Sequence, residues 1–295
     1  MFCITNSLSN GTMVQKKMEL IRMVDKMPAF PQSVHRVLQL TADINCAPKE
    51  LVEVITHDPV LTLKILSLLN SPYFGLSRSI SSIQQAVVFV GINTIKNLAL
   101  SIAPMGILPQ HIRSDHYMSQ LLLHSLATAT CTKQLCRRLG ISEIESTNYF
   151  VGGLLHDFGK VVLARFQNKN FKQALRLAEH KKISLLLAER KILGTTHTQV
   201  GSQLGKKWCL PKELVACLRD HHTPDKKNTR YLMVDCVFAA NQLVKKLGIG
   251  HAGNPIIENL PPRIADRFGM DLTDLAKSAS DFADELKKAS VFIHI

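Results

Sequence analysis

The feature that most constrains the fold of this chain is a helical spacing of apolar residues along most of its length. Apolar side chains three and four residues apart form one face of a helix, whereas a half-buried strand needs strict alternation. The alternating pattern is nearly absent here. The helical pattern is clearest in the N-terminal part, at Leu51, Val54, Ile55, Leu61, Ile65, Leu68 and Leu69. The sequence therefore predicts an all-α protein.

Capping residues and prolines mark the ends of the predicted helices. Asp58-Pro59 is typical of a helix start. The aspartate side chain accepts hydrogen bonds from the free N–H groups of the first turn, and proline is tolerated there because its missing N–H would have had no partner in the helix. Asn70-Ser71-Pro72 closes that helix, since the residue before a proline avoids helical geometry. We expect four or five short helices between residues 27 and 102.

Breaks in the pattern divide the chain into four segments. Pro104, Gly106 and Pro109 interrupt it before a long helix that holds His124, and a last amphipathic helix is predicted from Leu272 to Ala289. We predict a flexible tail over residues 1–20 and an N-terminal helical lobe over 21–108. A second helical lobe over 109–260 packs against it, and a helical extension covers 261–295.

Composition indicates a globular protein of the cytoplasm. The chain has 295 residues, of which 46% are hydrophobic and 20% charged, and no apolar run is long enough to span a bilayer. The N-terminus lacks the basic start and apolar core of a secretory signal. Seven scattered cysteines without a C-x-x-C pair favour reduced thiols in the core.

The formal charge of +13 raises the hypothesis of a nucleic-acid partner. However, the basic residues occur as dispersed pairs, such as Lys206-Lys207, without a glycine-rich phosphate loop or interleaved aromatic residues. A solvated helical surface is the better interpretation. A nucleic-acid binder would show a steep salt dependence of binding.

The His156-Asp157 pair lies in an apolar stretch, Leu154 to Lys160, and is the main candidate for chemistry. A buried carboxylate beside an imidazole needs compensation, and a metal ion commonly supplies it. Further histidines lie next to helical patterns at His124, His197 and His221-His222. Each taken singly could be an ordinary core histidine, and His221-His222 could simply end a helix. Taken together, they predict a metal centre.

Many separated positions resemble the HDOD proteins, a branch of the HD metal-dependent phosphohydrolase superfamily. The N-terminal set is Met27-Pro28-Ala29-Phe30-Pro31, Ile55-Thr56-His57-Asp58-Pro59, Leu69-Asn70-Ser71, Ile80, Ile83, Ala86 and Val90-Gly91. The second set is Gly153 to Lys160, Gly194-Thr195-Thr196-His197, Gly201, Trp208, Leu210-Pro211 and His221-His222. The resemblance implies an all-α fold, in which an HDOD lobe packs on an HD-type lobe, and a role in bacterial signalling.

The histidine pattern also resembles that of the HD-GYP phosphodiesterases of the same superfamily. This resemblance implies one or two divalent ions (Fe, Mn or Zn) and a ligand set of His124, His156, Asp157, His197, His221, His222 and Asn241. His124, His156, Asp157 and Asn241 would hold one ion, His197, His221 and His222 the second, with Asp157 between them. Asp157 and Lys160 are the candidate catalytic residues, although a structural role for Lys160, as a cap of its helix, is the favoured interpretation.

Three departures from the enzyme pattern affect the expected function. Asn241 replaces an aspartate and is a neutral, weaker ligand, and Gln120 lacks the charge that a third ion would need. Thr223-Pro224-Asp225-Lys226 replaces the Gly-Tyr-Pro segment, so we do not expect a cyclic dinucleotide substrate.

We therefore predict a regulatory module that binds signalling proteins and holds metal. The alternative is a metal-dependent phosphohydrolase acting on a nucleotide-type ligand. The oligomeric state is not predicted.

Overall fold

The computed structural model describes residues 18–43, 46–107, 115–224, 231–279 and 281–294. These residues form helices and contain no strand, so the predicted all-α class is confirmed. The predicted tail up to residue 17, together with Cys3, Pro109, Asp225 and Lys226, lies outside the described residues. A helix already covers residues 18–26, and therefore includes the last residues that we assigned to the tail.

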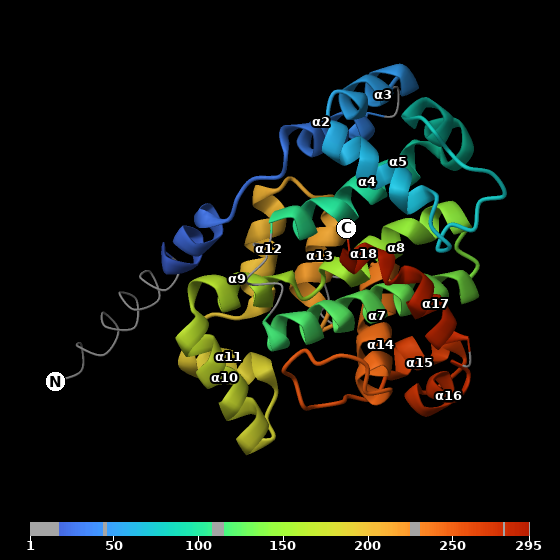
Figure 1. Cartoon of the computed structure of the whole chain (residues 1–295). Coiled ribbons are helices and arrows are strands. Elements are labelled where there is room, and N and C mark those ends of the chain that lie inside the picture. The colour runs from blue at the N-terminus through green and yellow to red at the C-terminus, as the bar shows by residue number, and fades with distance from the viewer. Residues whose placement is uncertain (1–17, 44–45, 108–114, 225–230, 280, 295) are drawn as a thin grey trace.

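The N-terminal helices lie together in the upper part of Figure 1 and pack on one another. They are α2 (Gln32–Ala42), α3 (Pro48–Thr56), α4 (Pro59–Leu69) and α5 (Ile83–Ile107). Asp58 caps α4 as predicted, because its side chain accepts a hydrogen bond from the N–H of Leu61. Asn70 ends α4, and its side chain bonds to the backbone of Ile80 on the far side of the following loop.

The long helix α5 differs from the prediction. It runs through Pro104 and Gly106, which we had expected to break the chain, and its non-helical point is instead Gly91 (φ 78°). Pro104 falls in the last turn, and the apolar side chains around it, such as Leu100 and Met105, are buried. Packing therefore outweighs the missing N–H at this position. By composition α5 could cross a membrane, but 61% of its most apolar window is buried inside the protein, as in a core helix.

The second lobe surrounds the histidines and lies below the first in Figure 1. Its helices are α7 (His116–Arg138), α8 (Glu143–Leu155), α9 (Phe158–Phe166), α10 (Asn168–Lys181), α11 (Leu185–Ile192), α12 (His197–Lys207), α13 (Lys212–Asp220) and α14 (Leu232–Lys246). Four of the described cysteines are buried free thiols, but Cys209 is exposed.

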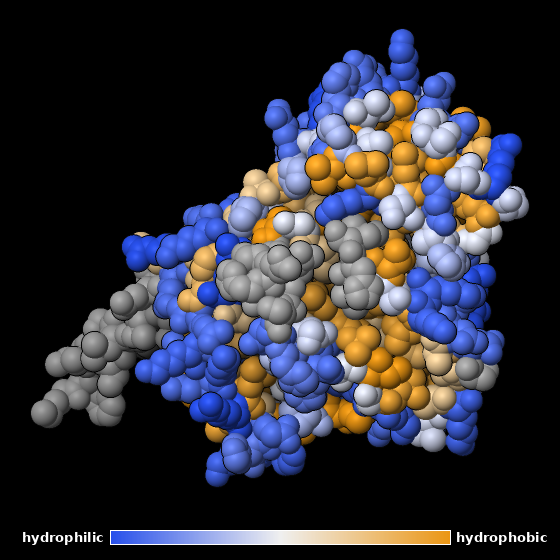
Figure 2. Space-filling view, viewed as in Figure 1, coloured by the Kyte–Doolittle hydropathy of each residue, from blue (hydrophilic) through white to orange (hydrophobic). Residues whose placement is uncertain are grey.

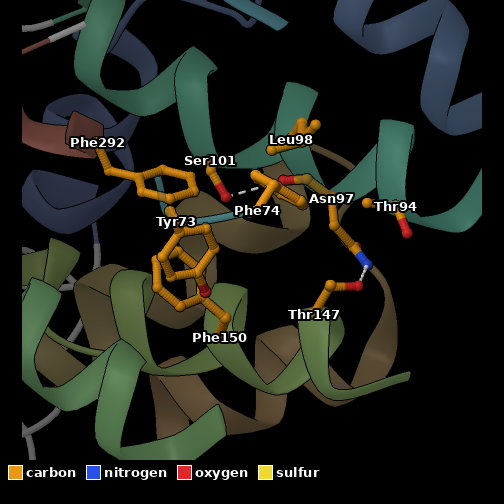
Figure 3. Close-up of a pocket in the computed structure, with 9 residues that line it drawn as sticks. All are labelled: Tyr73, Phe74, Thr94, Asn97, Leu98, Ser101, Thr147, Phe150 and Phe292. Carbon is orange, nitrogen blue, oxygen red and sulfur yellow. Dashed lines mark hydrogen bonds between the residues drawn. The ribbon is translucent and has the colours of Figure 1, made fainter. Parts of the chain in front are cut away.

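The two lobes share one continuous apolar core, and α5 packs directly on α8. Figure 3 shows this seam, where the Asn97 side chain of α5 donates hydrogen bonds to Thr147 Oγ1 (2.7 Å) and Asn148 Oδ1 (3.0 Å) of α8. A second junction joins residues 24–30 to the end of α12. There Lys207 donates to three backbone carbonyls, and Phe30 stacks on Trp208 at 4.3 Å. These contacts join the two groups of helices.

The C-terminal segment is helical but is not the single helix that we predicted from Leu272 to Ala289. It consists of α15 (Pro262–Phe268), α16 (Leu272–Lys277), α17 (Phe282–Ala289) and α18 (Val291–His294). The Arg138 guanidinium binds Ser278 Oγ (2.8 Å) and Ser278 O (3.0 Å), and a continuous helix would have used that carbonyl internally. A contact distant in the sequence therefore ends α16.

Candidate metal centre

Asp157 lies at the centre of a buried group of five histidines. His156 ends α8 and Asp157 begins α9, so the pair occupies a junction between two helices rather than the middle of one. His124 comes from the middle of α7. His197 is the first residue of α12, behind a capping box of Thr196 and Gln199. His221 and His222 follow the end of α13.

The two oxygens of Asp157 face different histidines. Oδ2 lies 3.3 Å from His156 Nε2 and 3.9 Å from His124 Nε2. Oδ1 lies 3.3 Å from His221 Nε2 and 3.5 Å from His197 Nε2, and His222 Nε2 is 3.1 Å from His197 Nε2. The residues therefore form two sets that could each hold an ion and that share Asp157. The resemblance implied the same two sets with Asn241 added to the first, and their occupation by ions stays a prediction.

Two glycines allow the helices that carry these residues to approach closely. A Cβ on Gly159 would lie 1.9 Å from the carbonyl oxygen of His197, so α9 and α12 touch backbone to backbone. A Cβ on Gly153 would lie 2.6 Å from Ala129 Cα, at the crossing of α8 and α7. Only glycine permits these separations. The small residues of the sequence motif therefore bring the histidines together.

Hydrogen bonds on the far side of the rings determine the tautomers of three histidines. His156 Nδ1 is 2.7 Å from Gly153 O, and His221 Nδ1 is 2.7 Å from Cys217 O. His197 Nδ1 is 2.8 Å from Glu189 Oε2. Carbonyls and carboxylates only accept, so each Nδ1 must carry the proton. Where such a ring is neutral, its Nε2 carries a lone pair that faces Asp157.

The atoms at the middle of the group have no hydrogen-bond partner among the described residues. They are His156 Nε2, His221 Nε2 and Asp157 Oδ1, all buried. Burial lowers the pKa of His221 to about 4 and holds the pKa values of His124 and His222 well below the usual range, so these rings are neutral at neutral pH. Neutral Nε2 lone pairs facing a carboxylate repel it unless a cation lies between them.

The spacing of these atoms suits a metal ion. Two ligands about 2.1 Å from one tetrahedral ion are about 3.4 Å apart, and the spacings around Oδ1 are 3.3 and 3.5 Å. Three imidazoles and one carboxylate are also a donor set that Zn, Fe and Mn accept. The residues present therefore fit such an ion.

Lys160 contacts the second oxygen of Asp157. Its ammonium donates to Asp157 Oδ2 (2.6 Å) and to Ala252 O (2.9 Å), and the side chain is buried. Burial alone would raise the pKa of the Asp157 carboxyl, but His156 and Lys160 hold it well below its usual range. The ammonium therefore balances a carboxylate rather than capping the end of a helix.

The sequence analysis missed Glu189, which is fully buried in α11. Its carboxylate accepts hydrogen bonds from both the backbone N–H (2.9 Å) and Nδ1 of His197. Such a carboxylate orients a metal-binding imidazole and raises its basicity. A glutamate inside the apolar pattern of Leu185 and Ala188 was the signal that could have found it.

Two further residues singled out from the sequence are Asn241 and Gln120. Asn241 is buried in α14, which packs on α7, and within the described part of the chain no hydrogen bond joins it to Asp157 or the histidines, so its role as a ligand stays a prediction. Gln120 contributes its backbone carbonyl, which accepts from the N–H of His251 (3.1 Å). This contact holds the loop at Gly250 against His124.

The fold and the buried His/Asp group together define an all-α protein with a candidate metal centre. The HDOD domain model matches residues 27–224, so the chain belongs to the HDOD family. The structure is similar to that of an HDOD domain protein of unknown function from Geobacter sulfurreducens. That likeness has a TM-score of 0.77 and 26% identity, and it covers 97% of this chain and 99% of the other.

Two further proteins are more distant. A Shewanella amazonensis protein provisionally named a phosphohydrolase has a TM-score of 0.71 at 20% identity, with 93% of this chain and 97% of that chain covered; this likeness shows the fold alone. An uncharacterised protein of Treponema pallidum is 23% identical over 246 residues, covering 83% of this chain and 46% of that protein. The chain therefore spans about half the length of the curated relative that it matches.

Proposed function

We propose that this chain is a regulatory HDOD protein of the bacterial cytoplasm whose second lobe holds one divalent metal ion, and that the ion stabilises or signals rather than hydrolyses. The observation that carries the metal site is the convergence of the Nε2 atoms of His197 and His221 on Oδ1 of the buried Asp157 carboxylate. In the part of the chain that the structure describes, His221 Nε2 and Asp157 Oδ1 have no hydrogen-bond partner. A cation between them would satisfy both atoms.

The proposed ligands are Asp157 Oδ1, His197, His221 and His222, whose ligand atoms lie within 4.8 Å of one another. The other set, His124 and His156 with Asp157 Oδ2, faces the Lys160 ammonium. A divalent ion beside that buried ammonium would be repelled by several kcal/mol at an effective dielectric constant of about 20. We therefore favour one ion over two, and Asn241 has no ligand role in this proposal.

Burial argues for a structural or sensing role of the ion. His124, His156, Asp157, His197 and His221 are each at most 1% exposed, and His222 is 9% exposed. A phosphate group could not reach Asp157 in this conformation. An enclosed set of four protein ligands is also typical of structural rather than catalytic metal sites.

The second candidate function is a metal-dependent phosphohydrolase. The observation that favours it is the donor set itself, since a bound ion would supply Lewis acidity and an activated water. Asp157 and Lys160 would then lie at the reacting phosphate. This function requires the site to open, and the partial exposure of His222 makes that side the natural entrance.

The proposed partners are signalling proteins that bind the N-terminal lobe. Large apolar side chains are exposed there at Val60 and Leu63 of α4 and at Val88 and Phe89 of α5. Figure 2 shows apolar surface among polar atoms over these N-terminal helices. Clustered exposed apolar residues commonly mark protein-binding surfaces. The buried free thiols agree with a reducing compartment.

One experiment separates the two candidate functions. Protein loaded with Mn, Fe or Zn is assayed for hydrolysis of bis(4-nitrophenyl) phosphate, and its thermal unfolding is measured with and without a chelator. We expect chelation to lower the unfolding temperature, because the ion binds only the folded state. We also expect no hydrolysis above the level of His221→Ala. Hydrolysis that this substitution abolishes would instead establish the phosphohydrolase.

A further inference from the structure

A second cavity lies apart from the histidines, between the start of α7 and the helices α9 and α10. Its volume is about 290 Å³. The apolar lining comes from Met118, Ala164, Phe171 and Leu175, and the ring of Tyr117 packs edge-on against Phe171 at 5.8 Å. Cavities near this size with a few polar groups on their walls are typical small-molecule sites.

The charged groups on the wall of this cavity are mainly basic. Arg165 is half-buried, and its Nη1 is buried without a hydrogen-bond partner among the described residues. Its recorded contact is with the neighbouring ring of Phe166, at 5.3 Å. Lys172, one turn along α10, has no acidic partner within the described part of the chain. A buried guanidinium nitrogen without a hydrogen-bond partner is costly, and an anion from solution would satisfy Nη1.

One acidic group also lines the cavity. Asp115 caps α7, and its Oδ1 accepts a hydrogen bond from the N–H of Met118 at 3.2 Å. Its charge is therefore directed to the positive end of a helix, and it forms no ion pair with Arg165 or Lys172. With two cations against one engaged carboxylate, the cavity carries a net positive charge.

We propose that this cavity binds a small organic anion with an apolar body, such as an aromatic carboxylate or phosphate. Its charged group pairs with Arg165 and Lys172, and its apolar body lies against Phe171 and Leu175. The site is separate from the metal centre and does not rest on the metal proposal. The two sites are nevertheless neighbours. At the metal centre, Lys160 donates a hydrogen bond to the carbonyl of Ala252. The next residue, Gly253, lies close to Tyr117 Oη at the cavity.

The test uses 4-fluorobenzylphosphonate, which cannot be hydrolysed as an ester, and follows its fluorine NMR signal during titration with the full-length protein. A chelator is present so that the phosphonate cannot report on a metal ion. The neutral 4-fluorobenzyl alcohol serves as the control ligand. We expect saturable binding of the phosphonate that is at least about tenfold tighter than binding of the alcohol, because the charge-assisted hydrogen bonds are missing from the alcohol.

Three variants locate the binding. Arg165→Gln should weaken phosphonate affinity about tenfold or more, and Lys172→Gln should weaken it by a smaller factor. Lys169→Gln is the matched control, because Lys169 is an exposed lysine on the same helix that does not line the cavity. Lys172 is itself exposed, so its variant tests the site even if Arg165→Gln unfolds. Equal affinity for the alcohol, or equal effects of Lys172→Gln and Lys169→Gln, would overturn the proposal.

Discussion

Substitution of Gly159 by alanine tests whether the contact between α9 and α12 determines the geometry of the metal centre. The added Cβ would lie 1.9 Å from His197 O, whereas ordinary contact begins at 3.4 Å. Both groups belong to the backbone, so neither can turn away, and the helices must separate by about 1.5 Å. Overpacking of this kind costs about 1–3 kcal/mol, and the better helix propensity of alanine returns at most about 1 kcal/mol.

We therefore expect Gly159→Ala to lower the free energy of unfolding by about 2 kcal/mol. It should also weaken metal binding, since α12 carries His197. Denaturant unfolding followed by circular dichroism, on metal-free protein, measures the stability change without the ion. Gly201→Ala at the same interface is the control. Its Cβ would press only lightly on the end of the Leu218 side chain, at 3.2 Å, and would meet Leu218 Cβ and Gly159 N at the ordinary contact distances of 3.5 and 3.6 Å. It should therefore change stability by less than about 1 kcal/mol. Equal stability of the two variants would refute the close-contact account.

Three further predictions concern charges around the centre. Glu189→Gln should weaken metal affinity about 10- to 100-fold while the fold persists, because the amide orients His197 less firmly. Competition with a metal-binding dye measures this affinity. An unchanged affinity would argue against the role of Glu189. Lys160→Met should raise the binding capacity from one ion to two, as counted by isothermal titration, and a capacity that stays at one would contradict the repulsion argument. Burial lowers the pKa of His221 to about 4, below its ordinary 6.5, so the unfolded chain binds more protons between these values. The free energy of unfolding of metal-free protein should therefore fall as the pH drops from 6.5 toward 4, and His221 should account for up to about 3 kcal/mol of this loss. In unfolding measured across this pH range, His221→Gln should show a smaller loss.

The sequence was sufficient for the fold class and for Asp157 and the five histidines that meet at the centre. Helical spacing, the cap at Asp58 and the glycines beside His156 are local signals, and the structure reproduces the helices and junctions that they indicate. Local signals do not predict where a helix ends when a contact with a distant part of the chain determines that end. Pro104 remains inside α5 because its surroundings are buried, and α16 ends where Arg138 takes the carbonyl of Ser278.

The same reasoning explains what was missed at the site. The role of Glu189 depends on a turn that places α11 beside the start of α12, and no periodicity reports that turn. Lys160 and Asp157 lie three residues apart in one helical turn, so their contact could have been inferred. Asn241 was assigned by its position in a pattern, and its role as a ligand stays a prediction.

The most direct test of the central claim is the metal content of untagged protein purified anaerobically without chelator, measured by mass spectrometry beside Asp157→Asn. Asparagine nearly preserves the volume but removes the charge that the buried site needs. The account predicts about one equivalent of Fe, Mn or Zn in the wild type and almost none in the variant. Less than about a tenth of an equivalent in the wild type, with no uptake when metal is added, would contradict it.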